Sequence, residues 1–366
     1  MENIKDDNRK PKAQGRPVIA ITCGDPNGVG YEILLKAVSD PHITEICTPV
    51  IYGNMQAVRK HIQLMKEAQE SEHAEPQEQH SLLLNQTDSA AKAKEGRVNL
   101  VNCYADSVPL AIGTSTPEAG AASLAALEQA VKDLKAGTVH ALVTAPINKE
   151  NIQSDQFRYS GHTEYLTHHF GEGHDSLMMM ISDQMRVALV TNHVPLRKVA
   201  EFITEERILG KLSLLNQTLK DDFIIRRPRI AVLALNPHSG DNGLLGTEEK
   251  EIIIPAIEKA KAQGIEAFGP YSADGFFGAG HYRSFDAVLG MYHDQGLIPF
   301  KSLDMDGVNF TAGLDIIRTS PDHGTAYALA GKNQADAASM RNALYLAIDL
   351  LRTRAEQQKL KANPPV

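Results

Sequence analysis

Short apolar runs rich in β-branched residues alternate with amphipathic stretches along most of the chain. Apolar runs bounded by Gly, Pro or Asn predict strands, and apolar residues recurring every three or four positions predict helices. The predicted strands are 17–22, 48–53, 97–103, 139–146, 176–182, 186–192, 229–236, 266–271 and 285–292. The predicted helices are 30–40, 54–69, 116–137, 205–223, 247–264, 324–331 and 333–361. Repeated strand-then-helix units predict a mainly parallel sheet with helices on both faces.

Three stretches depart from this alternation. The strands 176–182 and 186–192 are close enough to pair as a hairpin, which predicts an antiparallel element. Residues 1–16 are polar and lack the apolar segment of a secretory signal, so we expect a disordered tail. Residues 70–96 are rich in Gln and Glu and predict a polar insertion, with short structure around residues 82–84.

Composition excludes several classes of protein. The chain has 366 residues, 42% apolar and 22% charged, as expected for a globular enzyme-sized protein with a substantial core. A net charge of −8 argues against nucleic-acid or anionic-membrane binding. No apolar run approaches the roughly 20 residues of a membrane helix. The cysteines at 23, 47 and 103 are widely separated, so we expect a reduced, cytoplasmic protein without disulfides.

Three predicted strands each end within a few residues of a histidine. His193 follows the strand 186–192, and His238 follows the strand 229–236. His293 follows the strand 285–292 and precedes Asp294. Ligands of open α/β sheets bind outside the carboxyl ends of the strands. Neutral imidazoles suit Zn²⁺ and Co²⁺, and three of them leave a metal position open for catalysis. Taken singly, each histidine is better explained as a turn residue than as a ligand, so the metal hypothesis rests on the coincidence of three.

A later stretch carries candidate anion ligands. Lys301, Asn309, Arg318, Thr319 and Ser320 fall within a sequence dense in Gly, Asp and His, which predicts loops. Arg binds phosphate with two parallel hydrogen bonds, and Lys supplies a point charge. Alone, the two cations would be read as solvated surface residues; in this stretch they indicate an anionic substrate.

Ordered motifs then identify a family. They are "GDPNGVGYE", "SGHTEYL", "NHVPL", "LNPHSGDNGLLGTEE", "GPYSADGFF", "DAVLGMYHDQGLIPFK" and "VNFTAGLDIIRTSPDHGTAYALAGK". From about Val18 to about Leu351 the chain resembles the 4-hydroxythreonine-4-phosphate dehydrogenases of vitamin B6 synthesis. More distantly it is similar to isocitrate and isopropylmalate dehydrogenases. The resemblance implies a three-layer α/β fold of the isopropylmalate dehydrogenase type, with two subdomains flanking a cleft. We expect these subdomains at 17–150 plus 300–366, and at 151–299.

The resemblance implies roles for individual residues. His193, His238 and His293 would bind a divalent metal at a homodimer interface, with one histidine supplied by the partner subunit. The substrate ligands would be His162, Thr163, Asp274, Asp294, Lys301, Asn309 and Arg318. His162, Asp294 and Lys149 are the candidates for the general base, and each could instead only bind substrate.

The glycine-rich turn after the first strand is a separate candidate. Its glycines at 24, 28 and 30 do not have the G-x-G-x-x-G spacing of a Rossmann loop, so we interpret it as a turn lining a cofactor cleft. The loop from His323 to Lys332 would receive the adenosine part of NAD. The cofactor-binding candidates are Gly24, Asp25, Gly28, Gly324, Thr325, Ala326 and Gly331.

The function implied is NAD-dependent, metal-assisted oxidation of 4-phosphooxy-L-threonine at C3. Decarboxylation to 3-amino-2-oxopropyl phosphate would follow, since a ketone β to a carboxylate accepts electrons as CO₂ leaves. Zn²⁺ is the expected metal, with Mg²⁺ or Co²⁺ as alternatives, and NADP is the alternative cofactor. The rival hypotheses are a dehydrogenase of threonate or erythronate phosphates, a metal-dependent hydrolase or lyase without NAD, and a non-enzymatic ligand-binding protein.

Departures from the family pattern mark places to inspect. Tyr31 stands where the family usually has Pro, Gly275 stands where Thr is usual, and the 70–96 segment is longer than expected. None of these changes falls on a proposed metal ligand.

Overall fold

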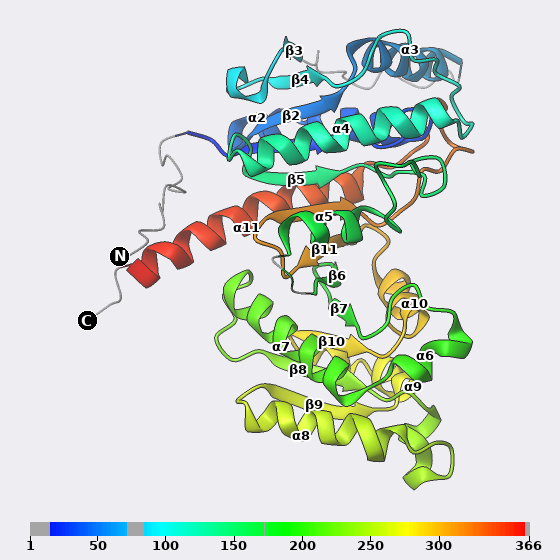
Figure 1. Cartoon of the computed structure of the whole chain (residues 1–366), viewed down its shortest axis with the longest axis vertical. Helices are drawn as coiled ribbons and strands as arrows, with labels where there is room; N and C mark the ends of the chain where they lie inside the picture. The colour runs from blue at the N-terminus through cyan, green and yellow to red at the C-terminus, as the bar shows by residue number, and fades with distance from the viewer. Residues whose placement is uncertain (1–14, 72–83, 172, 174, 363–366) are drawn as a thin grey trace. The chain divides into compact units, whose positions relative to one another are not determined.

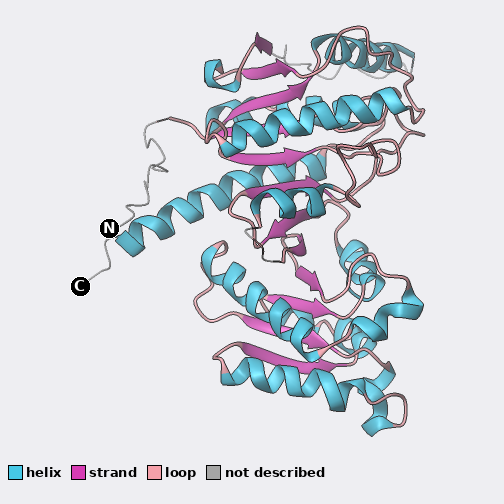
Figure 2. Ribbon diagram, in the orientation of Figure 1, coloured by secondary structure: helices cyan, strands magenta, loops and turns pink. Residues whose placement is uncertain are grey.

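A computed structural model describes residues 15–71, 84–171, 173 and 175–362. These residues form two compact units, drawn in Figures 1 and 2. Unit 1 comprises the described residues of Met1–Ser154 and Gly324–Ala337, and unit 2 those of Asp155–His323 and Ala338–Val366. The expected tail falls mostly on residues 1–14, which lie outside the described residues. Arg16, within the same predicted tail, donates a hydrogen bond to the carbonyl of Thr44.

Unit 1 is a parallel sheet covered by helices. Its strands are ordered β3-β4-β2-β1-β5, and each described pairing among them is parallel. The elements are β1 (Val18–Thr22), α1 (Gly30–Val38), α2 (Pro41–Ile46), β2 (Thr48–Gly53), α3 (Met55–Ser71), β3 (Leu84–Thr87), η1 (Ala90–Lys92), β4 (Val98–Asn102), α4 (Pro117–Lys135) and β5 (Ala141–Thr144). Every residue of β2 is buried, which explains why the sequence shows a continuous apolar run there.

Unit 2 combines parallel and antiparallel pairing. Its first elements are α5 (His162–Phe170), β6 (Leu177–Ile181), β7 (Arg186–Leu189), η2 (Leu196–Lys198), α6 (Val199–Phe202), α7 (Glu205–Asp221), β8 (Arg229–Leu233) and η3 (Pro237–Gly243). They are followed by η4 (Glu249–Ile253), α8 (Ile254–Ala262), β9 (Glu266–Tyr271), α9 (Ala273–Gly278), η5 (His281–Ser284), β10 (Ala287–Gly290), α10 (His293–Leu303), β11 (Val308–Ala312), β12 (Ile317–Pro321) and α11 (Ala338–Ala362). The strand order is β12-β11-β6-β7-β10-β8-β9.

The predicted hairpin is present, because β6 pairs antiparallel with β7. β11 is antiparallel to both β6 and β12, whereas β7, β10, β8 and β9 run parallel. The core of this unit is formed by side chains from β7, β8 and β10 packed against Phe276 and Phe300. The predicted class, α/β with a mainly parallel sheet and an antiparallel element, is therefore confirmed.

Several local predictions need correction. Asn309 and Arg318 lie on paired strands and Lys301 on a helix, rather than in loops. Residues 324–337, all of them described, form turns instead of a helix, and α11 begins only at Ala338. The predicted helix 247–264 begins with a π-helical turn, and Pro255 is tolerated because it lies in the first turn of α8.

The 70–96 segment is not simply an insertion. Residues 72–83 lie outside the described residues, but β3 forms the edge of the unit 1 sheet beside β4. Asn85 donates a hydrogen bond to Asn99 at 2.8 Å, and the backbone N–H of Lys94 donates to the same Asn99 oxygen at 2.8 Å. The part from 84 to 96 therefore belongs to the sheet.

The division into units also differs from the expected one. The boundary near residue 150 is close to the observed one, but only 324–337 returns to unit 1. Glu32 holds that segment, since its carboxylate accepts from the backbone N–H of Ala335 at 2.9 Å. Residues 300–323 and 338–362 belong to unit 2, because β11 pairs with β6 and α11 packs on β11 and β12.

Candidate functional site

The three predicted metal ligands all lie in unit 2, at the ends of neighbouring strands. His193 follows β7, His238 lies in the turn after β8, and His293 opens α10 after β10. The rings of His193 and His293 have centroids 6.0 Å apart. Among the residues that the structure describes, however, no group of three or more His, Cys, Asp or Glu side chains is gathered closely enough to hold a metal ion. One chain thus brings together two of the three predicted ligands.

His293 has a defined orientation. Its Nδ1 lies 2.7 Å from Oδ1 of Asp294, which leaves Nε2 for another ligand. A carboxylate behind a histidine fixes the tautomer and ring direction that metal binding needs. Asp294 thereby lies next to a metal-ligand candidate.

Asp274 lies near His238. The hydroxyl of Ser272 donates to Oδ1 of Asp274 at 2.7 Å, and this bond is the main reason that the pKa of Asp274 is lowered. The backbone N–H of Gly275 and the neighbouring His238 lower it further. A Cβ at Gly275 would meet open space, so the loss of the usual Thr side chain leaves room beside Asp274.

Arg318 is a buried cation on β12. The residue is only 3% exposed, and its Nη1 donates to the hydroxyl of Thr311 at 3.1 Å. Burial lowers the pKa of its guanidinium to about 10, and the carboxylate of Glu164 opposes that shift, so Arg318 stays charged at neutral pH. The first turn of α5 contains Glu164 together with His162 and Thr163. The structure therefore places Glu164, which shares a helical turn with His162 and Thr163, near Arg318.

Asn309 and Lys301 complete the predicted substrate set. Oδ1 of Asn309 is buried and accepts no hydrogen bond from any described residue, which makes it a candidate acceptor for a ligand. Nζ of Lys301 lies 3.0 Å from Oδ2 of Asp322, a residue that the sequence did not single out. Burial raises the pKa of Asp322, and the neighbouring charges of Lys301, His323 and His293 offset part of that rise. Only its place before His323, in the last quoted motif, could have pointed to it.

The predicted cofactor residues all lie in unit 1, where the two stretches that carry them touch. The backbone N–H of Val29 donates to the carbonyl of Thr325 at 2.9 Å. A Cβ at Gly28 would lie 2.7 Å from that same carbonyl oxygen, so only glycine permits this approach. Gly24 and Gly331 have φ of 64° and 76°. No Cβ contact lies within 4 Å at Gly324, which leaves open space there.

Asp25 holds this part of unit 1 together. Its Oδ2 accepts from the hydroxyl of Tyr327 at 2.8 Å and from Nδ2 of Asn151 at 2.8 Å, and its Oδ1 accepts from the N–H of Asn27 at 2.9 Å. The carboxylate is fully buried. Asp25 therefore positions the cofactor candidates 324–331, including Ala326 with its positive φ, through Tyr327.

Tyr31 is accommodated by a hydrogen-bonded cluster in unit 1. Its hydroxyl lies 2.8 Å from that of Tyr104 and accepts from the backbone N–H of Asn54 at 2.8 Å. Its ring stacks on His61 with centroids 5.1 Å apart. Nε2 of His61 lies 2.9 Å from the carbonyl of Pro26, in the glycine-rich turn. Tyr31 thus supports the glycine-rich turn through His61.

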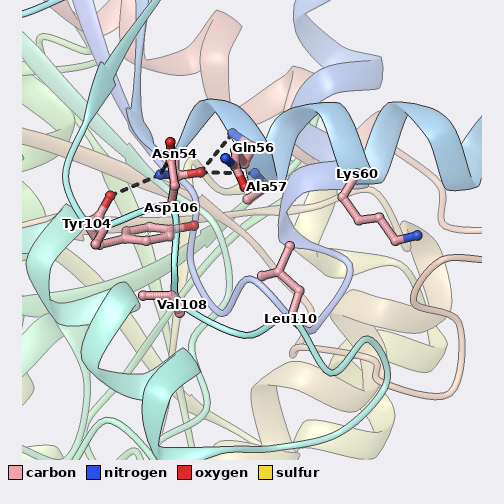
Figure 3. A pocket seen from close by; sticks show the side chains of 9 residues that line it. Asn54, Gln56, Ala57, Lys60, Tyr104, Asp106, Val108 and Leu110 are labelled. Carbon is pink, nitrogen blue, oxygen red and sulfur yellow. Dashed lines mark hydrogen bonds between the residues drawn. The ribbon is translucent and has the colours of Figure 1, made fainter.

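A cavity of about 280 Å³ lies next to this cluster (Figure 3). Asn54 caps α3 there and donates to the carbonyl of Tyr104 and the carboxylate of Asp106. Lys60 and Leu110 complete its wall. None of the residues predicted from the sequence to bind substrate, metal or cofactor lines this cavity.

Lys149, the third candidate for the general base, lies in unit 1 after β5 and is exposed. His162 and Asp294 lie in unit 2.

Among the described residues, no helix has the length and hydrophobicity needed to span a membrane.

Comparisons with known proteins identify similar chains. The family model described as "Pyridoxal phosphate biosynthetic protein PdxA" matches residues 45–347. A 4-hydroxythreonine-4-phosphate dehydrogenase from Bacteroides thetaiotaomicron is 49% identical over 347 residues, covering 94% of this chain and 92% of the relative. One from Aquifex aeolicus is 42% identical over 336 residues, with 91% and 98% coverage.

A solved structure supports the same relationship. The crystal structure of 4-hydroxythreonine-4-phosphate dehydrogenase from Klebsiella pneumoniae is similar with a TM-score of 0.77 and 34% identity, covering 92% of this chain and 98% of that one. A terephthalate 1,2-cis-dihydrodiol dehydrogenase from Burkholderia xenovorans, at 23% identity and a TM-score of 0.57, shares the fold.

Proposed function

This chain belongs to the PdxA family of pyridoxal phosphate biosynthesis, and on that premise we propose that it oxidises 4-phosphooxy-L-threonine at C3 with NAD. Relatives named as dehydrogenases of this kind support oxidoreductase chemistry. The observation that carries the proposal beyond the family is the pair His193 and His293, with ring centroids 6.0 Å apart, at the ends of adjacent strands.

This pair fits a divalent metal. Two imidazoles, one oriented by a carboxylate, are typical ligands of Zn²⁺ or Co²⁺, and Mg²⁺ is a weaker match because it favours oxygen ligands. A bound metal would supply Lewis-acid polarisation of the substrate's C3 oxygen. We propose that His238 of a second copy in a homodimer completes the ligand set, since the described residues of one chain gather no group of three ligand side chains.

The cations of unit 2 suit a phosphorylated carboxylic acid. Arg318 presents a buried guanidinium and Lys301 an ammonium group held by Asp322. The buried Oδ1 of Asn309 can accept from a substrate N–H or O–H group. We propose that His162 and Thr163, in the first turn of α5 with Glu164, add hydrogen-bonding groups to the substrate site.

The proposed reaction has an oxidation step at C3 and a decarboxylation step. A bound dinucleotide would supply the acceptor for the hydride that leaves C3, and His162, Asp294 or Lys149 would take the C3 hydroxyl proton. The resulting ketone accepts the electron pair of the carboxylate C–C bond as CO₂ leaves, and protonation at C2 gives 3-amino-2-oxopropyl phosphate. Variants of the three candidate bases identify the one whose loss flattens the pH dependence of kcat.

We assign the dinucleotide to unit 1. The touching stretches around Gly28 and Thr325, braced by Asp25 and Tyr327, offer backbone groups and open space at Gly324. The cofactor supplies the hydride acceptor, and comparing KM for NAD and NADP determines the preference. We place the enzyme in the cytoplasm, consistent with its composition.

Mixing inactive variants tests the shared metal site. We expect His193→Ala and His238→Ala to be inactive separately. If a dimer joins these residues from opposite chains, subunits exchanged at random should regain about one quarter of wild-type activity, because half of the dimers contain one intact site. Failure to recover activity after verified subunit exchange would place all ligands in one chain or exclude His238.

Substrate specificity is tested with paired substrates. We expect NADH formation from 4-phosphooxy-L-threonine to exceed that from 4-phosphothreonate or 4-phosphoerythronate. A preference for either sugar acid would contradict the proposal while keeping the fold and cofactor. Product formed without NADH would instead indicate a hydrolase or lyase.

A further inference from the structure

The turn that carries His238 folds over a buried carboxylate that the proposed reaction does not use. Glu249 is 3% exposed and begins the π-helical turn η4. Its Oε1 accepts from the backbone N–H groups of Leu235 at 2.8 Å and Asn236 at 2.7 Å. Its Oε2 accepts from Nδ2 of Asn236 at 2.9 Å. The chain leaving β8 is thus tied to Glu249 immediately before Pro237 and His238.

The turn itself has an unusual backbone. His238, Ser239, Gly240, Asp241 and Asn242 all have positive φ, between 43° and 76°. Residues with a Cβ disfavour this left-handed conformation, and four of these five carry one. Such a run persists only where surrounding contacts fix it.

Two glycines show how closely the turn wraps around Glu249. A Cβ at Gly240 would lie 2.6 Å from Oε2 of Glu249 and 2.8 Å from the carbonyl of Gly246. A Cβ at Gly246 would meet the side chain of Asn236 at 2.4 Å. The carboxylate therefore lies between the end of β8 and the turn, and constrains the backbone on both sides of His238.

We propose that Glu249 is a positioning residue for His238, which fixes the direction in which this imidazole meets the metal. The inference rests on the metal-binding role proposed above. A Gln at this position would keep the size of the side chain but exchange one acceptor oxygen for a donor. If the amide oxygen stays on the N–H groups of Leu235 and Asn236, the amide nitrogen faces Nδ2 of Asn236, which then loses its acceptor on residue 249; if the amide turns over, both backbone N–H groups lose theirs. In either orientation a contact that fixes the turn is lost, which lets the turn relax away from its left-handed form.

Cobalt titration of the metal-free, full-length protein tests this role. Co²⁺ binding is followed by calorimetry and by the visible absorption of bound Co²⁺, which reports ligand geometry. We expect Glu249→Gln to weaken Co²⁺ binding roughly tenfold or more, the scale seen when groups behind metal ligands are changed, and to alter the spectrum. The matched control Glu251→Gln changes an exposed carboxylate of the same turn. It should leave the Co²⁺ affinity and the absorption spectrum unchanged. Wild-type affinity and spectrum in Glu249→Gln would overturn the inference.

His238→Ala separates this inference from the metal assignment. If His238→Ala binds Co²⁺ as wild type does, the metal role of His238 is wrong and the inference falls with it. If His238→Ala binds weakly while Glu249→Gln binds normally, only the positioning role is wrong. Thermal unfolding without metal shows whether Glu249→Gln folds. If Glu249→Gln does not fold, Asn236→Ala replaces it in the test, because that variant keeps Glu249 and both of its backbone hydrogen bonds. Weaker Co²⁺ binding by Asn236→Ala would support the positioning role, and unchanged binding would overturn it.

Discussion

Nζ of Lys301, near the end of α10, lies 3.0 Å from Oδ2 of Asp322, which follows β12. Asp322 is held in turn by its backbone N–H, which donates to the hydroxyl of Ser339 at 3.1 Å. The pair joins two elements of unit 2 and fixes the Lys301 cation beside Asp322, a carboxylate near enough to His293 to be influenced by its charge. A cation held in place loses less side-chain entropy when an anion binds than a freely rotating lysine does.

Asp322→Asn should therefore raise KM for the phosphorylated substrate more than it lowers kcat. We expect roughly a tenfold rise, corresponding to about 1.4 kcal/mol of binding free energy. Steady-state kinetics measures the changes in KM and kcat separately. Asp349→Asn is the control, since Asp349 pairs with Arg352 at 3.5 Å on the surface. Equal KM values in wild type and Asp322→Asn would show that Lys301 does not depend on this carboxylate.

Arg318→Gln should weaken substrate binding further. Removing a charged hydrogen bond typically costs about 1.5–3 kcal/mol, which is roughly a 10- to 100-fold rise in KM. Because Arg318 is buried, the folded state of the variant must be verified by circular dichroism. Arg352→Gln, on the surface, should leave KM unchanged. A folded Arg318→Gln variant with normal KM would remove Arg318 from the phosphate site.

Tyr31→Phe should destabilise unit 1. The substitution keeps the ring on His61 but removes the oxygen that accepts from the N–H of Asn54. A buried donor left without a partner costs about 1–3 kcal/mol, which denaturant unfolding can measure. Tyr271→Phe, whose ring packs on Phe276 at 5.2 Å, is the comparison for loss of a tyrosine hydroxyl. No change in Tyr31→Phe would mean that water replaces the lost acceptor.

His61 should make stability sensitive to acid. Burial lowers the pKa of this imidazole, so below about pH 6.5 the unfolded chain binds a proton that the folded chain does not. The free energy of unfolding therefore falls as pH decreases, by at most about 1.4 kcal/mol per pH unit for this one group. His61→Gln should flatten the dependence, whereas His42→Gln, at an exposed site, should not. Parallel curves for wild type and His61→Gln would exclude His61 as the titrating group.

The sequence predicted elements best where burial is continuous. The strand 48–53 matches β2 at both ends, because every one of its side chains is buried. β11 and β12 were predicted as loops, since they carry Asn309 and Arg318 and lie among Gly and Asp residues. Their pairing with each other and with β6 outweighs that composition.

Tertiary contacts also override a local helix signal. Residues 324–331 contain several alanines, but Ala326 and Gly331 adopt positive φ and Tyr327 is held by Asp25, far away in sequence. The glycine-rich turn at 24–30 packs against residues 324–331, and no pattern within either stretch predicts this contact. Asp322 and Glu249 were missed for the same reason, because their roles depend on partners that only the fold brings near.

We propose above all that this protein transfers a hydride from 4-phosphooxy-L-threonine to NAD with the help of a divalent metal. The most direct measurement follows NADH and CO₂ together, using purified protein before and after metal removal. We expect equal amounts of the two products, loss of both after chelation, and recovery when Zn²⁺ or Co²⁺ is returned. Turnover that continues in the metal-free protein, or CO₂ released without NADH, would contradict the account.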